Sequence, residues 1–372
     1  MNKVIAPKWI EARQRWQVNA TIDGQRRTFV SSQPGRKGQQ ECFAKMQAAL
    51  NGKLTSRAKI KDIYPQFIED VYDRTSTGNT VNLESIGRNW IIPYLGNKEI
   101  ANLAEQDIQS VLNAAYKAGR SKKTIRNIRG AFTALLRYAR KAKLTTLRVE
   151  DVEIPSNAPV GVRKILNRDD IIKLFSTSKT TYQGKVVDDF YINAYRLLVL
   201  TGMRPGELCE LQRGNQSENG ILAVTGAFNR FREHTDGKTG NAQREFLLTD
   251  RAAAVLRDQT EMLKAKGIVT PYLFPMPTGS QLDVTLLYFA WKRFKAHNNI
   301  SDVSVYELRH TFVSIVQRTV PEPLIKPVIG HSSAMPSYQT YGHKMDGDAE
   351  LVASMIGERY DEIFSSKKNG TP

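Results

Sequence analysis

The stretch from Tyr306 to His343 constrains the fold of this chain most. It holds three tyrosines and three of the chain's five histidines, together with Arg309. Arg309 and His331 can both bind an anionic oxygen, and Tyr341 carries a hydroxyl that can attack a phosphorus or carbonyl centre. No acidic pair and no Cys/His grouping with metal-ligand spacing competes for this role. The chain is therefore expected to fold so that this stretch holds a phosphate and presents a tyrosine to it.

Length, charge and cysteine content bound the class of protein. With 372 residues, the chain is expected to form two or three domains. Lys+Arg 54 against Asp+Glu 37 gives a net charge of +17, which favours a polyanionic partner. The chain has two cysteines, no apolar signal peptide and no membrane-length apolar run. We therefore expect a protein of a reducing cytoplasm with no membrane partner.

Residues 1–54 are expected to form a small basic module that binds DNA. Residues 8–30 alternate apolar and polar side chains around an Asp23-Gly24 turn signal, and residues 39–50 have helical spacing. A sheet of this kind can enter a DNA major groove, although a solvated basic face is the plainer alternative. The candidate DNA contacts in this module are Arg13, Arg15, Arg26 and Arg27.

Residues 55–146 are expected to form a helical domain. Apolar spacing and end signals predict helices over 60–72, 81–94 and 104–118, followed by a long helix capped by Ser121. Acidic residues are nearly absent from this last helix, which favours a surface that follows DNA phosphates over an ordinary wet face. The candidate DNA contacts here are Arg120, Lys122, Lys123, Arg126 and Arg129.

Proline, glycine and polar residues over 147–164 predict a linker. A third domain is expected over 165–360, and residues 361–372 are expected to be a polar tail. A helix-like segment over 349–356 can pack on its own subunit or on a neighbour, and both arrangements stay open.

The third domain carries two further motifs. In Thr-Gly-Met-Arg204-Pro-Gly-Glu207-Leu, a turn between helices can hold an arginine rigidly, and Glu207 can orient its guanidinium. Lys238 lies in Asp-Gly-Lys-Thr-Gly, between strands predicted over 221–224 and 244–248, and it can reach a phosphate or a leaving oxygen. Taken singly, the two motifs are more simply a loop salt bridge and a solvated turn lysine.

Taken together and in order, these motifs resemble the tyrosine recombinase, or phage integrase, family. The likeness covers about residues 165–345 and has four pieces: Thr-Gly-Met-Arg-Pro-Gly-Glu-Leu, the Lys-Thr-Gly hairpin, Glu-Leu-Arg-His-Thr-Phe, and Ile-Gly-His-Ser-Ser followed by Thr-Tyr-Gly-His. The resemblance implies a multidomain, mainly α fold. Its parts are a β3α module that binds arm sites, a helical core-binding domain and a mixed α+β catalytic domain.

The resemblance also implies a role for each residue of the motifs. Arg204 and Arg309 would hold the non-bridging oxygens of the scissile phosphate, where charge develops in the transition state. Tyr341 would attack in line, forming a 3′-phosphotyrosine and releasing a 5′-hydroxyl. Lys238 would protonate that leaving oxygen, and His331 would hydrogen-bond the phosphate. No metal or nucleotide cofactor is implied, because the phosphotyrosine conserves the bond energy needed for rejoining.

The resemblance implies that Glu207 supports the two arginines. Alternatives stay open for the role of Tyr306 and for the identity of the nucleophile. Tyr306 stands three residues before Arg309, where the family most often has histidine. A phenol with an ordinary pKa of about 10 is a poor base, so Tyr306 is expected only to position the phosphate. Tyr338 is a rival nucleophile, but its distance from His331 fits the family less well than that of Tyr341.

The function implied is site-specific recombination of double-stranded DNA in a phage or integrative element. The enzyme would act as a homotetramer through a Holliday junction, and its arm-site module implies a DNA-bending host factor and an excisionase as further partners. Two alternatives remain. A type IB topoisomerase-like enzyme would need no arm-site module, and a non-catalytic DNA-binding regulator would not need the catalytic residue types.

Overall fold

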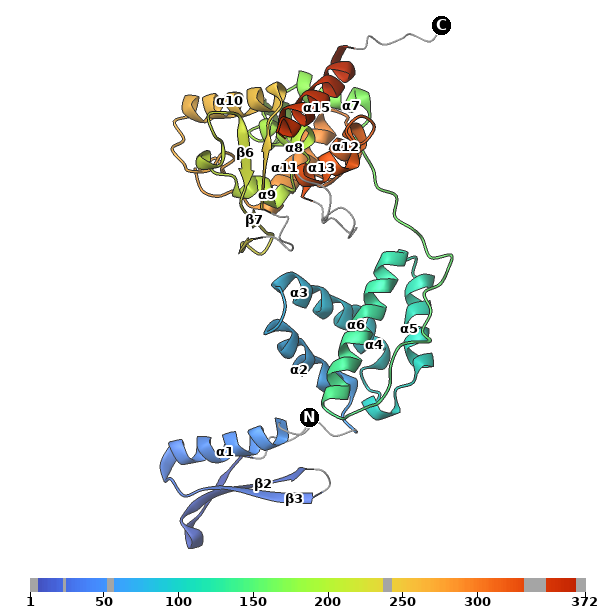
Figure 1. The fold of residues 1–372 in the computed structure, drawn as a ribbon. Coiled ribbons are helices and arrows are strands. Elements are labelled where there is room, and N and C mark those ends of the chain that lie inside the picture. Colours follow the sequence, from blue (N-terminus) through green and yellow to red (C-terminus); the bar gives the residue numbers. More distant parts are fainter. Residues whose placement is uncertain (1–5, 23–24, 52–56, 237–242, 331–345, 366–372) are drawn as a thin grey trace. The chain divides into compact units, whose positions relative to one another are not determined.

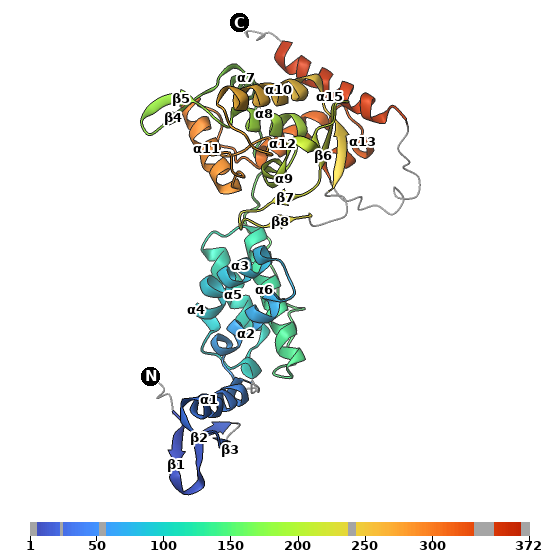
Figure 2. The same cartoon turned by 90° about the vertical axis from the view of Figure 1, so that its left-hand side faces the viewer.

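The chain divides into two compact units, Met1–Gly161 and Val162–Pro372. They are seen in a computed structural model (Figures 1 and 2) that describes residues 6–22, 25–51, 57–236, 243–330 and 346–365. The expected fold class is confirmed, since a small sheet module and a set of helices form the first unit and the second mixes helices with short strands. Among the described residues, no helix has the length and apolar character needed to cross a membrane.

The N-terminal module is a three-stranded antiparallel sheet covered on one face by a helix (Figure 1). Its elements are β1 (Lys8–Ile10), the 3-10 turn η1 (Glu11–Arg13), β2 (Arg15–Ile22), β3 (Gln25–Ser31) and α1 (Gly35–Asn51). Val18, Cys42 and Met46 form its small core. The strands and the helix were predicted, but α1 begins four residues early. Its first turn is polar and carries no apolar period.

The rest of the first unit is helical. Its elements are α2 (Ile60–Tyr72), α3 (Thr77–Ile86), the π-helical stretch η2 (Gly87–Ile91), α4 (Ile92–Leu95), the 3-10 turn η3 (Ile100–Asn102), α5 (Glu105–Lys117) and α6 (Lys122–Lys141). The prediction of one regular helix over 81–94 is therefore wrong. The helix begins earlier, at Thr77, and it is interrupted by the π-helical stretch η2. Gly87 explains part of the difference, because a Cβ there would lie 2.2 Å from the ring of Tyr64. The glycine lets the chain pass close to α2, where the widened turn begins.

Helix α6 and the chain after it complete this unit. Ser121 caps α6 as predicted, its hydroxyl accepting a hydrogen bond from the Thr124 amide at 3.3 Å. The expected linker over 147–164 is largely part of the helical unit, which corrects the prediction. Val149 and Val152 are buried in the same core as α6. Proline and glycine exclude regular structure here, but they do not prevent packing.

The second unit is built around α8, whose side chains are buried except for Arg196. Its elements are α7 (Arg168–Ser176), β4 (Lys179–Tyr182), β5 (Lys185–Asp188), α8 (Ile192–Thr201), α9 (Pro205–Glu210), η4 (Arg213–Asn215), β6 (Ile221–Val224), β7 (Ala227–Phe228), β8 (His234–Thr235), β9 (Arg244–Leu247), α10 (Asp250–Ala265), α11 (Val284–His297), α12 (Glu307–Val316), α13 (Glu322–Ile329) and α15 (Asp348–Ser365).

Three short antiparallel pairs, β4–β5, β6–β9 and β7–β8, belong to this second unit. Strands β6 and β9 were predicted, and Ile221 lies opposite Leu247 in their register. The β4–β5 hairpin was not predicted, and Figure 2 shows it projecting beside α11.

Helix α15 packs on its own chain, against α7, α12, α13 and β9. Tyr360 is buried and its hydroxyl donates to the Val199 carbonyl. The rings of Phe364 and Phe175 meet edge to face, with centroids 5.0 Å apart. The polar tail expected from residue 361 is therefore wrong at its start, because the helix continues to Ser365 on apolar contacts.

Candidate active site

Three arginines from distant parts of the second unit meet at the C-terminal end of α13. The last carbonyls of a helix have no partner within it, and they form the negative end of its dipole. Each guanidinium donates to a different one of three consecutive carbonyls: Arg244 Nε to Val328 at 2.6 Å, Arg309 Nη2 to Ile329 at 2.6 Å, and Arg204 Nη2 to Gly330 at 3.2 Å. The end of α13 therefore gathers three positive charges in one place.

The turn that carries Arg204 is fixed by its sequence. Gly202 ends α8 with a φ of +64°, and a Cβ there would lie 2.3 Å from the ring of Phe312. Pro205 then starts α9, as proline favours at a first helical position. In the first turn, Glu207 accepts hydrogen bonds from the Arg204 amide at 2.8 Å and from Arg204 Nη1 at 2.7 Å. The expected contact between Glu207 and Arg204 is therefore present.

Glu207 also pairs with Arg244, a residue that sequence reasoning missed. Arg244 Nη1 lies 3.1 Å from Glu207 Oε1, and Nη2 lies 2.8 Å from Oε2. Both side chains are buried, with 5% of Arg244 and 4% of Glu207 exposed. Strand alternation is the signal that could have found it, since Arg244 shares a strand face with the buried Phe246.

Opposing effects act on the pKa of Glu207. Burial by itself would raise the pKa, but hydrogen bonds and charge from Arg244, and hydrogen bonds from Arg204, outweigh it. The pKa therefore lies below its ordinary value, and the carboxylate is charged at neutral pH. Glu207 compensates the buried Arg244 and orients the more exposed Arg204.

Arg309 is the second arginine of the expected phosphate site, and it is only 2% exposed. Its Nη1 donates to the Gly202 carbonyl at 2.8 Å. Burial, followed by the nearby charge of Arg204, lowers the pKa of Arg309 to about 10, so it remains protonated at neutral pH. Arg204 and Arg309 are therefore neighbours at the end of α13, where they donate to the consecutive carbonyls of Gly330 and Ile329. Guanidinium donors are the type that binds a tetrahedral anion, which is the role expected of this pair.

Tyr306 lies at the start of α12, one helical turn before Arg309. It is 44% exposed, and its ring meets that of His310 edge to face at 5.4 Å. Burial lowers the pKa of His310, and the charge of Arg163 lowers it further. His310 is therefore mainly neutral at pH 7 and serves as a ring partner of Tyr306.

The remaining expected residues of the site lie outside the described part of the chain. These are Lys238, His331, Tyr338 and Tyr341. The last three of them follow Gly330, which ends one described stretch and whose carbonyl accepts a hydrogen bond from Arg204.

Comparison with known proteins decides the family. A model of the phage integrase family matches residues 164–347, and a model of the phage integrase N-terminal SAM-like domain matches residues 59–116. The chain belongs to the phage integrase family. The site at the end of α13 lies inside the first match, and the helical core of the first unit overlaps the second. Among curated protein sequences, none matches the chain.

Solved structures share the integrase fold. The Tn1549 transposon integrase in complex with transposon right end DNA has a TM-score of 0.60 and 18% identity, covering 79% of this chain and 98% of that one. A lambda integrase tetramer bound to a Holliday junction has a TM-score of 0.60 and 16% identity, covering 93% of this chain and 99% of that one. At these low identities the TM-scores establish a common fold.

The candidate DNA contacts of the N-terminal module lie on different faces. Trp16, Val18 and Ala20 of β2 pack toward α1, so the alternate residue Arg15 belongs to the open face. Arg26 pairs with Thr21 in the sheet and shares that open face, whereas Arg27 pairs with Ala20 on the covered side. Arg13 is exposed in the turn before β2. The open face therefore carries Arg15 and Arg26, and Arg27 does not join them.

The candidates around α6 also separate into two groups. Arg120, Lys123 and Arg126 are exposed. Arg129 is half-buried, and its Nη2 donates to the Val149 carbonyl at 2.9 Å, which holds the chain after α6 against the helix. Lys122 Nζ lies 3.4 Å from the Ser156 carbonyl. Arg120, Lys123 and Arg126 therefore remain the candidates for contact with DNA phosphates.

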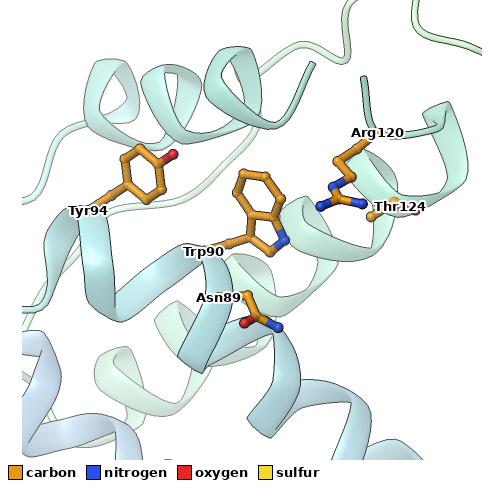
Figure 3. A pocket seen from close by; sticks show the side chains of 5 residues that line it. All are labelled: Asn89, Trp90, Tyr94, Arg120 and Thr124. Atoms are coloured by element: carbon orange, nitrogen blue, oxygen red, sulfur yellow. The ribbon is translucent and has the colours of Figure 1, made fainter. Parts of the chain in front are cut away.

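An open aromatic pocket lies beside the start of α6 (Figure 3). It is lined by Asn89, Trp90, Tyr94, Arg120 and Thr124. The indole of Trp90 stands between the other two large side chains. The Tyr94 ring is nearly parallel to it with centroids 6.2 Å apart, and the Arg120 guanidinium lies 5.9 Å from its centroid. The cation–π contact orients Arg120, so this arginine is less free than its exposure implies.

Proposed function

We propose that this integrase family member is a tyrosine site-specific recombinase that cuts and rejoins double-stranded DNA. The observation that carries the proposal is the pair Arg204 and Arg309, held on neighbouring carbonyls at the end of α13. Their fixed donors favour a phosphate whose charge grows in the transition state. The chain continues from that point directly into the segment with His331 and Tyr341.

In this proposal each side chain has one task. The Tyr341 hydroxyl releases its proton to water as its oxygen attacks phosphorus in line. The bond to the 5′ oxygen breaks, and Lys238 gives that oxygen a proton, which it regains from water. Arg204 and Arg309 hold the non-bridging oxygens while His331 hydrogen-bonds one of them. Tyr306 positions the phosphate. The phosphotyrosine keeps the bond energy, so rejoining to a second strand requires neither metal nor nucleotide.

The biological setting is part of the same proposal. We place the protein on DNA in a bacterial cell, integrating or excising a phage genome or mobile element. A homotetramer would exchange strands through a Holliday junction, as the shared fold with a lambda integrase tetramer bound to such a junction supports. The N-terminal module would bind separate arm sites, with a DNA-bending host factor and an excisionase setting direction.

The two alternatives to this proposal can be separated by one assay on a supercoiled plasmid that carries two copies of the element's attachment site. A recombinase excises or inverts the intervening DNA in the presence of EDTA and without nucleotide, and Tyr341→Phe abolishes the reaction. Relaxation of supercoils without exchanged junctions would instead support a topoisomerase. Site-specific binding with neither product would support the regulator and overturn the proposal.

A further inference from the structure

We infer that Arg244 is a positioning residue for strand cleavage, holding Arg204 through Glu207 and fixing both to the end of α13. This inference rests on the proposed recombinase function. It assigns a task to a residue that lies six positions beyond the turn lysine, Lys238, and belongs to none of the family-like motifs.

The first observation is that one guanidinium joins three elements. Arg244 opens β9, and it binds Glu207 of α9 through both terminal nitrogens. Its Nε donates to the Val328 carbonyl of α13 at 2.6 Å. A planar guanidinium can satisfy these partners at once, whereas the point charge of lysine cannot reproduce the paired geometry. The relative placement of the three elements therefore depends on an arginine here.

The second observation is the carboxylate that Arg244 shares with Arg204. The side chain of Arg244 is 5% exposed, and its Nη1 and Nη2 bind the two oxygens of Glu207. Arg309 is also buried but donates to the Gly202 and Ile329 carbonyls, so the shared carboxylate, and not burial, connects Arg244 to Arg204. Arg244 therefore acts through Arg204, which Glu207 holds at 2.7 Å.

The third observation concerns the start of the nucleophile segment. Val328, Ile329 and Gly330 are the last described residues before it, and each carbonyl is held by a different arginine. Loss of Arg244 frees the first of these carbonyls and leaves Glu207 with Arg204 alone. Both the phosphate-binding arginine and the point from which Tyr341 departs would then lose their fixed positions.

The test compares Arg244→Lys and Arg244→Met in the full-length protein, with Arg196 as a matched control. Arg196 is half-buried and, like Arg244, donates to backbone carbonyls; its partners are those of Leu174, Phe175 and Thr177 at the end of α7. The measured quantities are DNA affinity and the rate of covalent attachment to a nicked attachment site at saturating protein. Circular dichroism confirms that each variant is folded.

We expect Arg244→Lys to slow attachment by about 10-fold and Arg244→Met by about 100-fold, the scale of a misplacement near 1 Å. DNA affinity should not change, and Arg196→Lys should keep the wild-type rate. Wild-type rates in Arg244→Lys and Arg244→Met would overturn the inference and leave the recombinase standing. If the wild-type protein does not become attached to DNA at all, the proposed recombinase function is wrong and so is this role of Arg244.

A double-mutant cycle separates positioning from general stability. If Arg244 acts through Arg204, then Arg244→Lys should add almost no loss once Arg204→Lys is present. Losses that multiply would mean that the two residues act independently, and they would overturn the inference. The Arg196→Lys variant combined with Arg204→Lys provides the matching control.

Discussion

Replacement of Glu207 by glutamine tests how much the buried charge cluster stabilises the second unit. The carboxylate accepts four hydrogen bonds, two from Arg204 and two from Arg244, at 2.7 to 3.1 Å. Glutamine keeps the shape and one acceptor oxygen, but it places an amide donor against a guanidinium. Removing one partner of a buried ion pair costs about 3–5 kcal/mol, because the other charge stays buried. We expect about 3 kcal/mol, since glutamine retains part of the hydrogen bonding.

Hydrogen–deuterium exchange of α8 amides in the full-length protein measures this free energy within the second unit. Glu245→Gln is the matched control, because Glu245 is the next residue of β9 after Arg244 and is exposed. A surface change of this kind alters stability by less than about 0.5 kcal/mol. Equal protection of α8 amides in Glu207→Gln and Glu245→Gln would show that the Glu207 carboxylate does not stabilise the second unit.

Four further predictions concern the pH dependence of Glu207 and the contacts of three other residues. The pKa of Glu207 lies below its ordinary value of 4.5, so its stabilising effect is full above that pH and is lost as pH falls through the lowered pKa. Thermal unfolding against pH should therefore be flatter in acid for Glu207→Gln than for wild type. Arg126→Ala should reduce the slope of log affinity against log salt by about 0.9, the effect of one phosphate contact. Arg129→Ala should leave that slope unchanged and cost about 1 kcal/mol of stability, because Arg129 binds a backbone carbonyl. Tyr360→Phe should destabilise the second unit by about 1 kcal/mol in the same exchange measurement, since its buried hydroxyl binds α15 to α8.

Local patterns predicted much of this fold because they need no knowledge of distant partners. Helix α2 was predicted with the bounds it has, and α6 with its cap and its buried face, since apolar spacing and Ser121 are both local signals. Strands β6 and β9 followed from β-rich runs around a glycine turn. The turn at Arg204 followed from its glycine, proline and glutamate.

Features set by tertiary contacts escaped prediction. The π-helical stretch depends on the approach of Gly87 to Tyr64, which no local period records. The segment after α6 packs on this helix because Arg129 donates to the Val149 carbonyl and because apolar side chains of the segment are buried in the same core. Helix α15 extends into the residues expected to form a polar tail because the ring of Phe364 packs against that of Phe175.

The candidate site was predictable in part. The glycine turn and the helix around Arg309 identified two arginines and Glu207. The third arginine, Arg244, is recognised only when α9, β9 and α13 are brought together. A strand arginine looks solvated until its carboxylate partner is known, and Glu207 lies 37 residues away in the sequence.

In the proposed reaction, Tyr341 becomes covalently joined to DNA at the phosphate held by Arg204 and Arg309. The direct measurement incubates full-length protein with nicked attachment-site DNA in EDTA, digests the product and identifies the nucleotide-bearing peptide by mass spectrometry. We predict a 3′-phosphotyrosyl nucleotide on Tyr341, with attachment lost in Tyr341→Phe and retained in Tyr338→Phe. A nucleotide on Tyr338, or DNA bound at its site without any covalent peptide, would contradict the claim.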